Sequence, residues 1–125
     1  MAITKADREI IKAKYGGCCA YCGQELGKKW HVDHIEPVLR NISNGYEMDR
    51  PELDTIDNMN PACAPCNLYK SSCSIELFRE RIATQADVTW RASRSFRTAE
   101  AFGLVVRTRR QVVFWFERYN EEEVK

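Results

Sequence analysis

The sequence has no long apolar run. Even the apolar stretch Val112–Phe116 is far shorter than the roughly 20 residues that a membrane-spanning helix needs, so we expect no membrane-spanning helix. Residues 1–15 carry charges throughout and contain no apolar signal stretch. We therefore expect a cytoplasmic, reducing location, where disulfides are an unlikely use for the six cysteines.

An excess of charge is lacking as well, since the formal net charge of the 125 residues is +1. With 44% apolar and 30% charged residues, the chain has the composition of a soluble globular protein, and we expect one domain over 1–125. The charges are unevenly distributed: nine arginines and only four acidic residues lie between Arg79 and Arg118. This bias favours a binding face for a polyanion such as DNA, although a solvated helical surface explains it equally well.

Local patterns predict a mixture of helices and strands, which is the α+β class. Thr4 is a typical N-cap for a helix over about 4–15. Strands are expected at 29–35 and near 57–60, with a polar loop at 40–56 that turns at Asn44-Gly45. Helical spacing returns after residue 67 and continues to about 99. Two short strands at 105–106 and 112–116 are expected to form a β-hairpin around Arg109-Arg110.

Four cysteines form two CxxC pairs about forty residues apart, Cys19/Cys22 and Cys63/Cys66. Two such pairs provide four thiolates for a tetrahedral zinc ion, and no coordination position remains for substrate. We therefore predict a structural zinc that contributes folding free energy to a small domain. Unligated buried thiols are the weaker interpretation.

Cys18 and Cys73 are left over, and we interpret both as spare thiols. Cys18 could take the place of Cys19, but its spacing to Cys22 is looser. A redox protein is disfavoured, because the CxxC motif is doubled and no thioredoxin-like βαβ pattern is present.

Polar motifs lie between and beside the cysteine pairs: Asp33-His34-Ile35-Glu36-Pro37, then Asp57-Asn58-Met59, and Asn67 to Lys70 directly after Cys66. This ordered set resembles the HNH endonuclease family. The resemblance implies a ββα-metal finger core at about 19–70, held by the structural zinc. Flanking it would be the N-terminal helix and a C-terminal extension at about 71–125.

The residue chemistry is consistent with phosphodiester hydrolysis. A histidine such as His34 can act as a general base near neutral pH. Asp33 and Asn67 offer hard oxygen ligands, which suit Mg²⁺ or Mn²⁺ better than zinc. Adjacent residues on a regular strand point to opposite faces, so Asp33 and His34 should not both face one metal. The resemblance implies a distorted strand end, with which Pro37 is compatible.

The remaining site residues depend more heavily on the resemblance, which implies that Asn58 orients the loop carrying the base. Taken alone, Asn58 would be read as a turn or helix-cap residue. Lys70 is either a phosphate contact or an ordinary exposed lysine, and Arg40 is a second candidate for DNA contact.

The sequence therefore predicts a metal-dependent DNA endonuclease with a structural zinc and a catalytic Mg²⁺ or Mn²⁺. One site cuts one strand, so we expect a monomer or weak dimer that nicks DNA and leaves 5′-phosphate and 3′-hydroxyl ends. The alternative is a non-catalytic zinc module that binds nucleic acid or protein. That alternative explains the cysteines but gives no reason for Asp33, His34 or Asn67.

Overall fold

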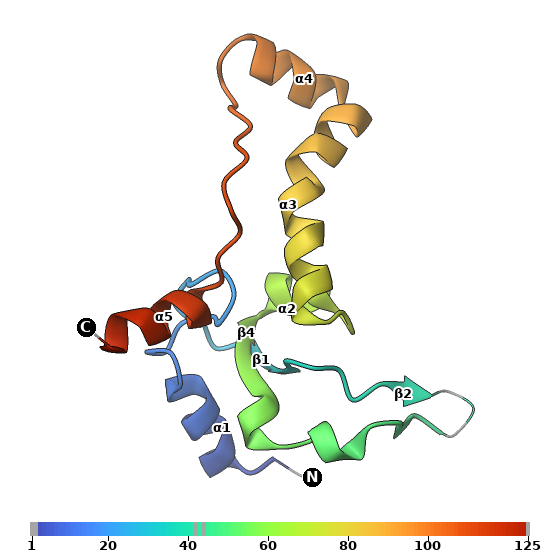
Figure 1. Cartoon of the computed structure of the whole chain (residues 1–125), viewed down its shortest axis with the longest axis vertical. Coiled ribbons are helices and arrows are strands. Elements are labelled where there is room, and N and C mark those ends of the chain that lie inside the picture. The colour runs from blue at the N-terminus through green and yellow to red at the C-terminus, as the bar shows by residue number, and fades with distance from the viewer. Residues whose placement is uncertain (1–2, 42, 44, 125) are drawn as a thin grey trace. The chain divides into compact units, whose positions relative to one another are not determined.

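The computed structural model describes residues 3–41, 43 and 45–124, which form helices and small sheets and so confirm the α+β class (Figure 1). The chain divides into two compact units. The first combines Met1–Ile75 with Val113–Lys125, and the second is Glu76–Val112. All the residues predicted for the functional site belong to the first unit.

Helix α1 spans Lys5–Ala13 and confirms the helix expected near the N-terminus. It begins with a capping box, in which the Thr4 hydroxyl accepts from the Asp7 backbone and the Asp7 carboxylate accepts from the Thr4 backbone. Just after the helix, Lys14 Nζ donates to the backbone carbonyl of Met59 at 2.6 Å. The helix is thereby anchored to the strand that leads into the second cysteine pair.

The central element is an antiparallel pair of strands, β1 at Trp30–His34 and β4 at Met59–Cys63. Their register places Asp33 opposite Asn60. Helix α2, at Ala64–Lys70, follows β4 directly and packs near both strands. The end of β1 and the side chains of α2 are thus brought into one neighbourhood.

The loop between β1 and β4 contains a second, very small sheet, in which β2 at Arg40–Asn41 pairs with β3 at Glu47–Met48. Two 3-10 turns follow, η2 at Pro51–Leu53 and η3 at Ile56–Asn58. The turn predicted at Asn44-Gly45 includes Asn44, which lies outside the described residues.

The predicted C-terminal β-hairpin is wrong. Residues 105–114 form no strand, and helix α5 spans Trp115–Val124. The backbone N–H groups of Trp115 and Phe116 donate to the carbonyls of Tyr21 and Ala20, while that of Phe114 donates to the Glu117 carboxylate. Packing against the first cysteine pair therefore overrides the β-propensity of these aromatic residues.

The second unit contains most of α3, which spans Ile75–Ala92, and all of α4, which spans Arg94–Ala101. Arg107 returns to these helices and donates to Glu100 at 2.5 Å and to Asp87 at 3.0 Å. Its guanidinium also lies 4.9 Å from the centroid of the Trp90 ring. No helix within the described part of the chain is long and apolar enough to span a membrane.

Candidate metal centres and catalytic cleft

The four predicted zinc ligands come together. The sulfur atoms of Cys19, Cys22, Cys63 and Cys66 all lie within 4.8 Å of one another. A tetrahedral zinc ion with Zn–S bonds of about 2.3 Å separates its ligand sulfurs by about 3.8 Å. The Cys22 and Cys63 sulfurs are 3.8 Å apart. The spacing and the donor chemistry therefore fit a bound zinc ion.

The thiols of this cluster differ in pKa. A hydrogen bond from the Cys66 thiol lowers the pKa of Cys19 to about 4, and the same bond raises the pKa of Cys66. Burial raises the pKa of Cys22 to about 11. The Cys19 sulfur therefore readily becomes a thiolate, while Cys22 and Cys66 keep protons that a bound cation would displace.

A cleft of about 690 Å³ lies beside the end of β1. Four of the residues predicted for catalysis, metal binding or DNA contact line it, namely Asp33, His34, Asn67 and Arg40. They come from β1, α2 and β2, elements that the sequence separates by up to about thirty residues. A cleft of this size has room for water and a phosphate group beside the protein oxygens.

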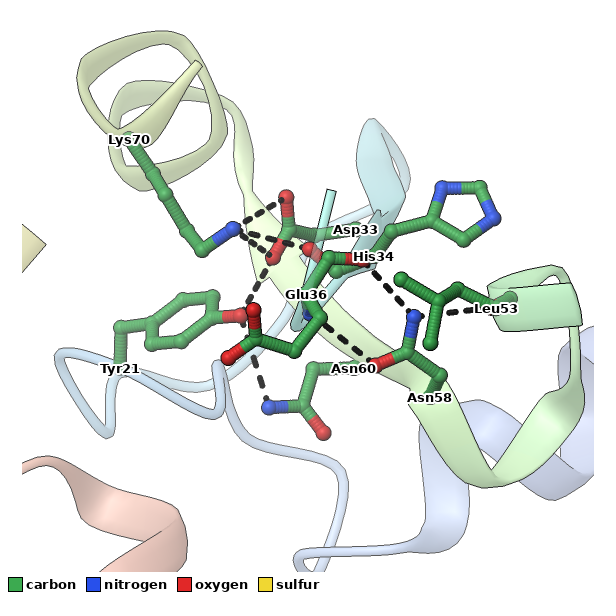
Figure 2. Close-up of polar contacts among 8 residues, drawn as sticks. All are labelled: Tyr21, Asp33, His34, Glu36, Leu53, Asn58, Asn60 and Lys70. Atoms are coloured by element: carbon green, nitrogen blue, oxygen red, sulfur yellow. Dashed lines mark hydrogen bonds and ion pairs between the residues drawn. The ribbon is translucent and has the colours of Figure 1, made fainter. Parts of the chain in front are cut away.

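Asp33 occupies the buried side of this cleft and is only 5% exposed. The Tyr21 hydroxyl donates to its Oδ2 atom (Figure 2). Lys70 Nζ lies 3.2 Å from Oδ2 and 3.5 Å from Oδ1. Burial raises the pKa of the Asp33 carboxyl, an effect that the Lys70 charge and the Tyr21 hydrogen bond oppose.

Lys70 is fully buried, and its ammonium also donates to the backbone carbonyl of His34 at 2.9 Å. A phosphate contact from Lys70 would require this side chain to leave both partners. In this structure Lys70 instead neutralises the Asp33 carboxylate and ties the C-terminal end of α2 to the end of β1.

His34 points away from Asp33, as Figure 2 shows. The pairing of β1 with β4 continues through both residues, so no β-bulge separates them, and β1 ends at His34. Both nevertheless line the same cleft. The Nε2 atom of His34 lies 2.9 Å from Oδ1 of Asp54, a residue that the sequence analysis did not select.

The Asn58 side chain links two loop segments, one just after β1 and one at η2. Its Oδ1 atom accepts from the Glu36 backbone N–H at 3.0 Å, and its Nδ2 atom donates to the Glu36 carbonyl at 2.9 Å. Nδ2 also donates to the Leu53 carbonyl at 2.8 Å (Figure 2). Its side-chain amide thus holds the residues just after His34 against the segment that carries Asp54.

Asn67 is half-buried on α2, while Arg40 is exposed at the cleft rim, where its Nη1 atom donates to the Tyr46 carbonyl at 3.4 Å. Three residues of the cleft wall have left-handed backbone without being glycine: Leu39 (φ 53°), Tyr46 (φ 65°) and Ser71 (φ 52°). Such conformations are uncommon for side-chain-bearing residues and gather at functional sites.

Tyr21 and Asp54 are the site residues that sequence reasoning missed. Tyr21 lies inside the first CxxC motif, and this position was the one available signal. Asp54 was visible only as one of several acids in a polar loop, and nothing in the pattern marked it as a partner of His34.

Paired strands followed by a helix, four cysteine sulfurs close enough together to hold a metal ion, and a polar cleft beside β1 characterise this small domain of mixed α and β structure. Residues 19–72, somewhat less than half of the chain, match the family model described as HNH endonuclease. This segment is therefore similar to the HNH endonuclease family. No curated protein and no solved structure matches the chain.

Proposed function

We propose that the protein is a metal-dependent DNA endonuclease that hydrolyses phosphodiester bonds in the cleft of the first unit. The observation that carries this proposal is the meeting of Asp33, His34 and Asn67 along one cleft. The HNH match over residues 19–72 supports the same conclusion. A zinc-binding module without catalysis would need the cysteine cluster but not these three residues.

Asp33 and Asn67 would hold a Mg²⁺ or Mn²⁺ ion, because a carboxylate and an amide oxygen are hard ligands and the cleft leaves space for water and phosphate. When bound, the ion would stabilise negative charge on the phosphoryl group and the leaving oxygen. Lys70 would share the Asp33 carboxylate with that ion.

His34 is the general base in this proposal. An ionised Asp54 only accepts hydrogen bonds, so Nε2 of His34 is the donor and Nδ1 is the nitrogen that remains to take a proton from water. The water oxygen forms a bond to phosphorus as the bond to the 3′ oxygen breaks. The products are a 5′-phosphate and a 3′-hydroxyl, the latter receiving its proton from solvent.

The rest of the fold supports this chemistry. Asn58 orients the loop after His34, the four cysteines hold a structural zinc, and Arg40 contacts the DNA backbone at the rim. One such cleft cuts one strand at a time, so a monomer or weak dimer nicks duplex DNA. We take the whole chain as one nuclease domain. The arginines between Arg79 and Arg110 contribute additional DNA contacts.

Supercoiled plasmid provides the test. Zinc-loaded protein with Mg²⁺ or Mn²⁺ should convert it to nicked circles, and chelation of the added metal should stop the reaction. His34→Ala should keep zinc, fold and DNA binding while cleavage falls by about a hundredfold or more. Added imidazole should restore part of that loss, whereas added Mn²⁺ should not.

Two outcomes would count against the proposal. Wild-type protein that binds DNA but never nicks it under either metal would favour the non-catalytic zinc module. An active His34→Ala protein would remove the proposed base, even with the zinc site intact.

A further inference from the structure

One side chain connects the cysteine cluster with the cleft. Tyr21 lies between Cys19 and Cys22 in the first cysteine pair, and its hydroxyl donates to Oδ2 of Asp33 (Figure 2). The Tyr21 side chain is only 3% exposed. A buried hydrogen bond thus joins the residue between two predicted zinc ligands to the predicted ligand of the catalytic metal.

The Tyr21 ring is fixed on several sides. Phe114 packs against it edge-on, with centroids 5.4 Å apart and planes at 82°, and Phe116 does so at 6.1 Å and 89°. The Tyr21 backbone carbonyl accepts from the Trp115 N–H at 3.1 Å. A phenol has few rotatable bonds, so these contacts leave its hydroxyl essentially one position.

The Asp33 carboxylate is held from two directions. Tyr21 donates to Oδ2 from the cysteine side, and Lys70 lies 3.2 Å from the same atom on the α2 side. Asn60, directly opposite Asp33 in the strand register, donates to the Tyr21 oxygen at 3.5 Å. This arrangement fixes the rotation of the carboxylate and therefore the direction of its remaining lone pairs.

We propose that Tyr21 is a positioning residue. Through it, the first cysteine pair with its bound zinc sets the orientation of Asp33 for the catalytic metal. The inference rests on the proposed function, because it takes Asp33 as a ligand of that metal. Replacing a residue that orients a metal ligand without touching the metal typically weakens metal affinity ten- to a hundredfold. Zinc would then govern catalytic metal binding as well as folding.

The test uses full-length, zinc-loaded protein and Mn²⁺ binding followed by electron paramagnetic resonance, which requires no DNA cleavage. Tyr21→Phe removes only the hydroxyl, and it should weaken Mn²⁺ binding about tenfold while zinc content stays at one equivalent. Tyr15→Phe is the matched control, because Tyr15 belongs to the same aromatic cluster and packs against Phe116. That control should bind Mn²⁺ as the wild type does.

Plasmid cleavage adds a second readout. Tyr21 touches neither substrate nor metal in this proposal, so Tyr21→Phe should regain near-wild-type cleavage when Mn²⁺ is raised to saturation. Unchanged Mn²⁺ affinity in Tyr21→Phe would overturn the inference, and so would a cleavage defect that saturating Mn²⁺ leaves in place.

Two further variants keep the result interpretable. If Tyr21→Phe loses zinc, Phe114→Leu replaces it, since this change keeps the hydroxyl but loosens the ring. It should weaken Mn²⁺ binding about threefold, between the wild type and a full loss of the contact, and unchanged binding would overturn the proposal. Asp33→Ala distinguishes a failure of the proposed function from a failure of this inference. If Asp33→Ala binds Mn²⁺ as tightly as the wild type does, Asp33 is not a ligand of the catalytic metal.

Discussion

The Nε2 atom of His34 lies 2.9 Å from Oδ1 of Asp54, so one of the two ring nitrogens is committed to a carboxylate. The Asp54 side chain is only 7% exposed, and that of His34 is 21% exposed. A buried carboxylate in this position fixes both the ring orientation and the tautomer of a histidine. For a histidine that must take a proton from water, that choice of tautomer decides which nitrogen is available.

Asp54→Asn should therefore lower the rate of plasmid nicking by about a hundredfold, with little change in the DNA concentration that gives half the maximal rate. The amide of asparagine can donate to Nε2, which would leave the proton on Nδ1 and block it. Asp49→Asn is the matched control, because Asp49 lines the same cleft, is exposed and is a second acid of the same loop. Equal rates for the two variants would remove Asp54 from the mechanism.

Lys70→Met should reduce the free energy of unfolding by about 3–5 kcal/mol, because it leaves the buried Asp33 carboxylate without its partner. Urea denaturation of the zinc-loaded protein measures this loss. Added Mn²⁺ should restore part of it, since a cation that binds the folded protein supplies the missing charge. The control, Lys28→Met, removes an exposed lysine and should change stability by less than about 0.5 kcal/mol.

The same experiment distinguishes two roles for Lys70, a contact with phosphate and an ion pair with Asp33. A lysine whose function is to contact phosphate would leave the stability of the free protein unchanged on replacement. It would affect only the DNA affinity and its dependence on salt.

Cys66→Ser should abolish stoichiometric zinc binding and lower the unfolding temperature strongly, since it removes one of four ligands from a site that supplies folding free energy. Elemental analysis and calorimetry give the two readouts. Cys18→Ser is the control, because Cys18 neighbours Cys19 in sequence but lies outside the sulfur cluster. A Cys66→Ser protein that is fully folded and metal-free would argue against a structural zinc.

The second unit, Glu76–Val112, carries eight arginines and four acidic residues. Arg109 and Arg110 are exposed within it. Replacing both by glutamine should weaken DNA binding and reduce the slope of log affinity against log salt by about 1 to 2. Replacing Lys28 and Lys29 by glutamine removes two exposed lysines from the first unit and should leave the slope nearly unchanged. Identical slopes for the two double variants would place the DNA elsewhere.

Local signals predicted the parts of the fold that depend on local chemistry. Thr4 and Asp7, three residues apart, are typical of the capping box that begins α1. The spacing of the cysteine pairs predicted a cluster, and the structure brings the four sulfurs together. The residues at 112–116 were misjudged because their β-propensity is intrinsic, whereas their hydrogen bonds to Ala20 and Tyr21 depend on contacts nearly a hundred residues away.

The site divides in the same way. Asp33, His34 and Asn67 were selected through a family motif, and all three line one cleft. The partners of these residues were not predicted. Tyr21 and Asp54 meet Asp33 and His34 through tertiary packing, and a single sequence contains no pairing information of that kind.

The two cysteine pairs enclose the stretch that carries Asp33, His34, Arg40 and Asn58, so a zinc ion between them would convert about forty residues into a closed ring. Lengthening a ring that is already closed costs little, since each doubling of a flexible loop adds only about 0.6 kcal/mol of closure entropy. Insertions between β2 and β3 would therefore leave the two cysteine pairs and the β1–β4 strand pair in place. This segment borders the cleft through Arg40 and Tyr46, so under the proposed function its insertions would alter the contacts with DNA without moving Asp33, His34 or Asn67.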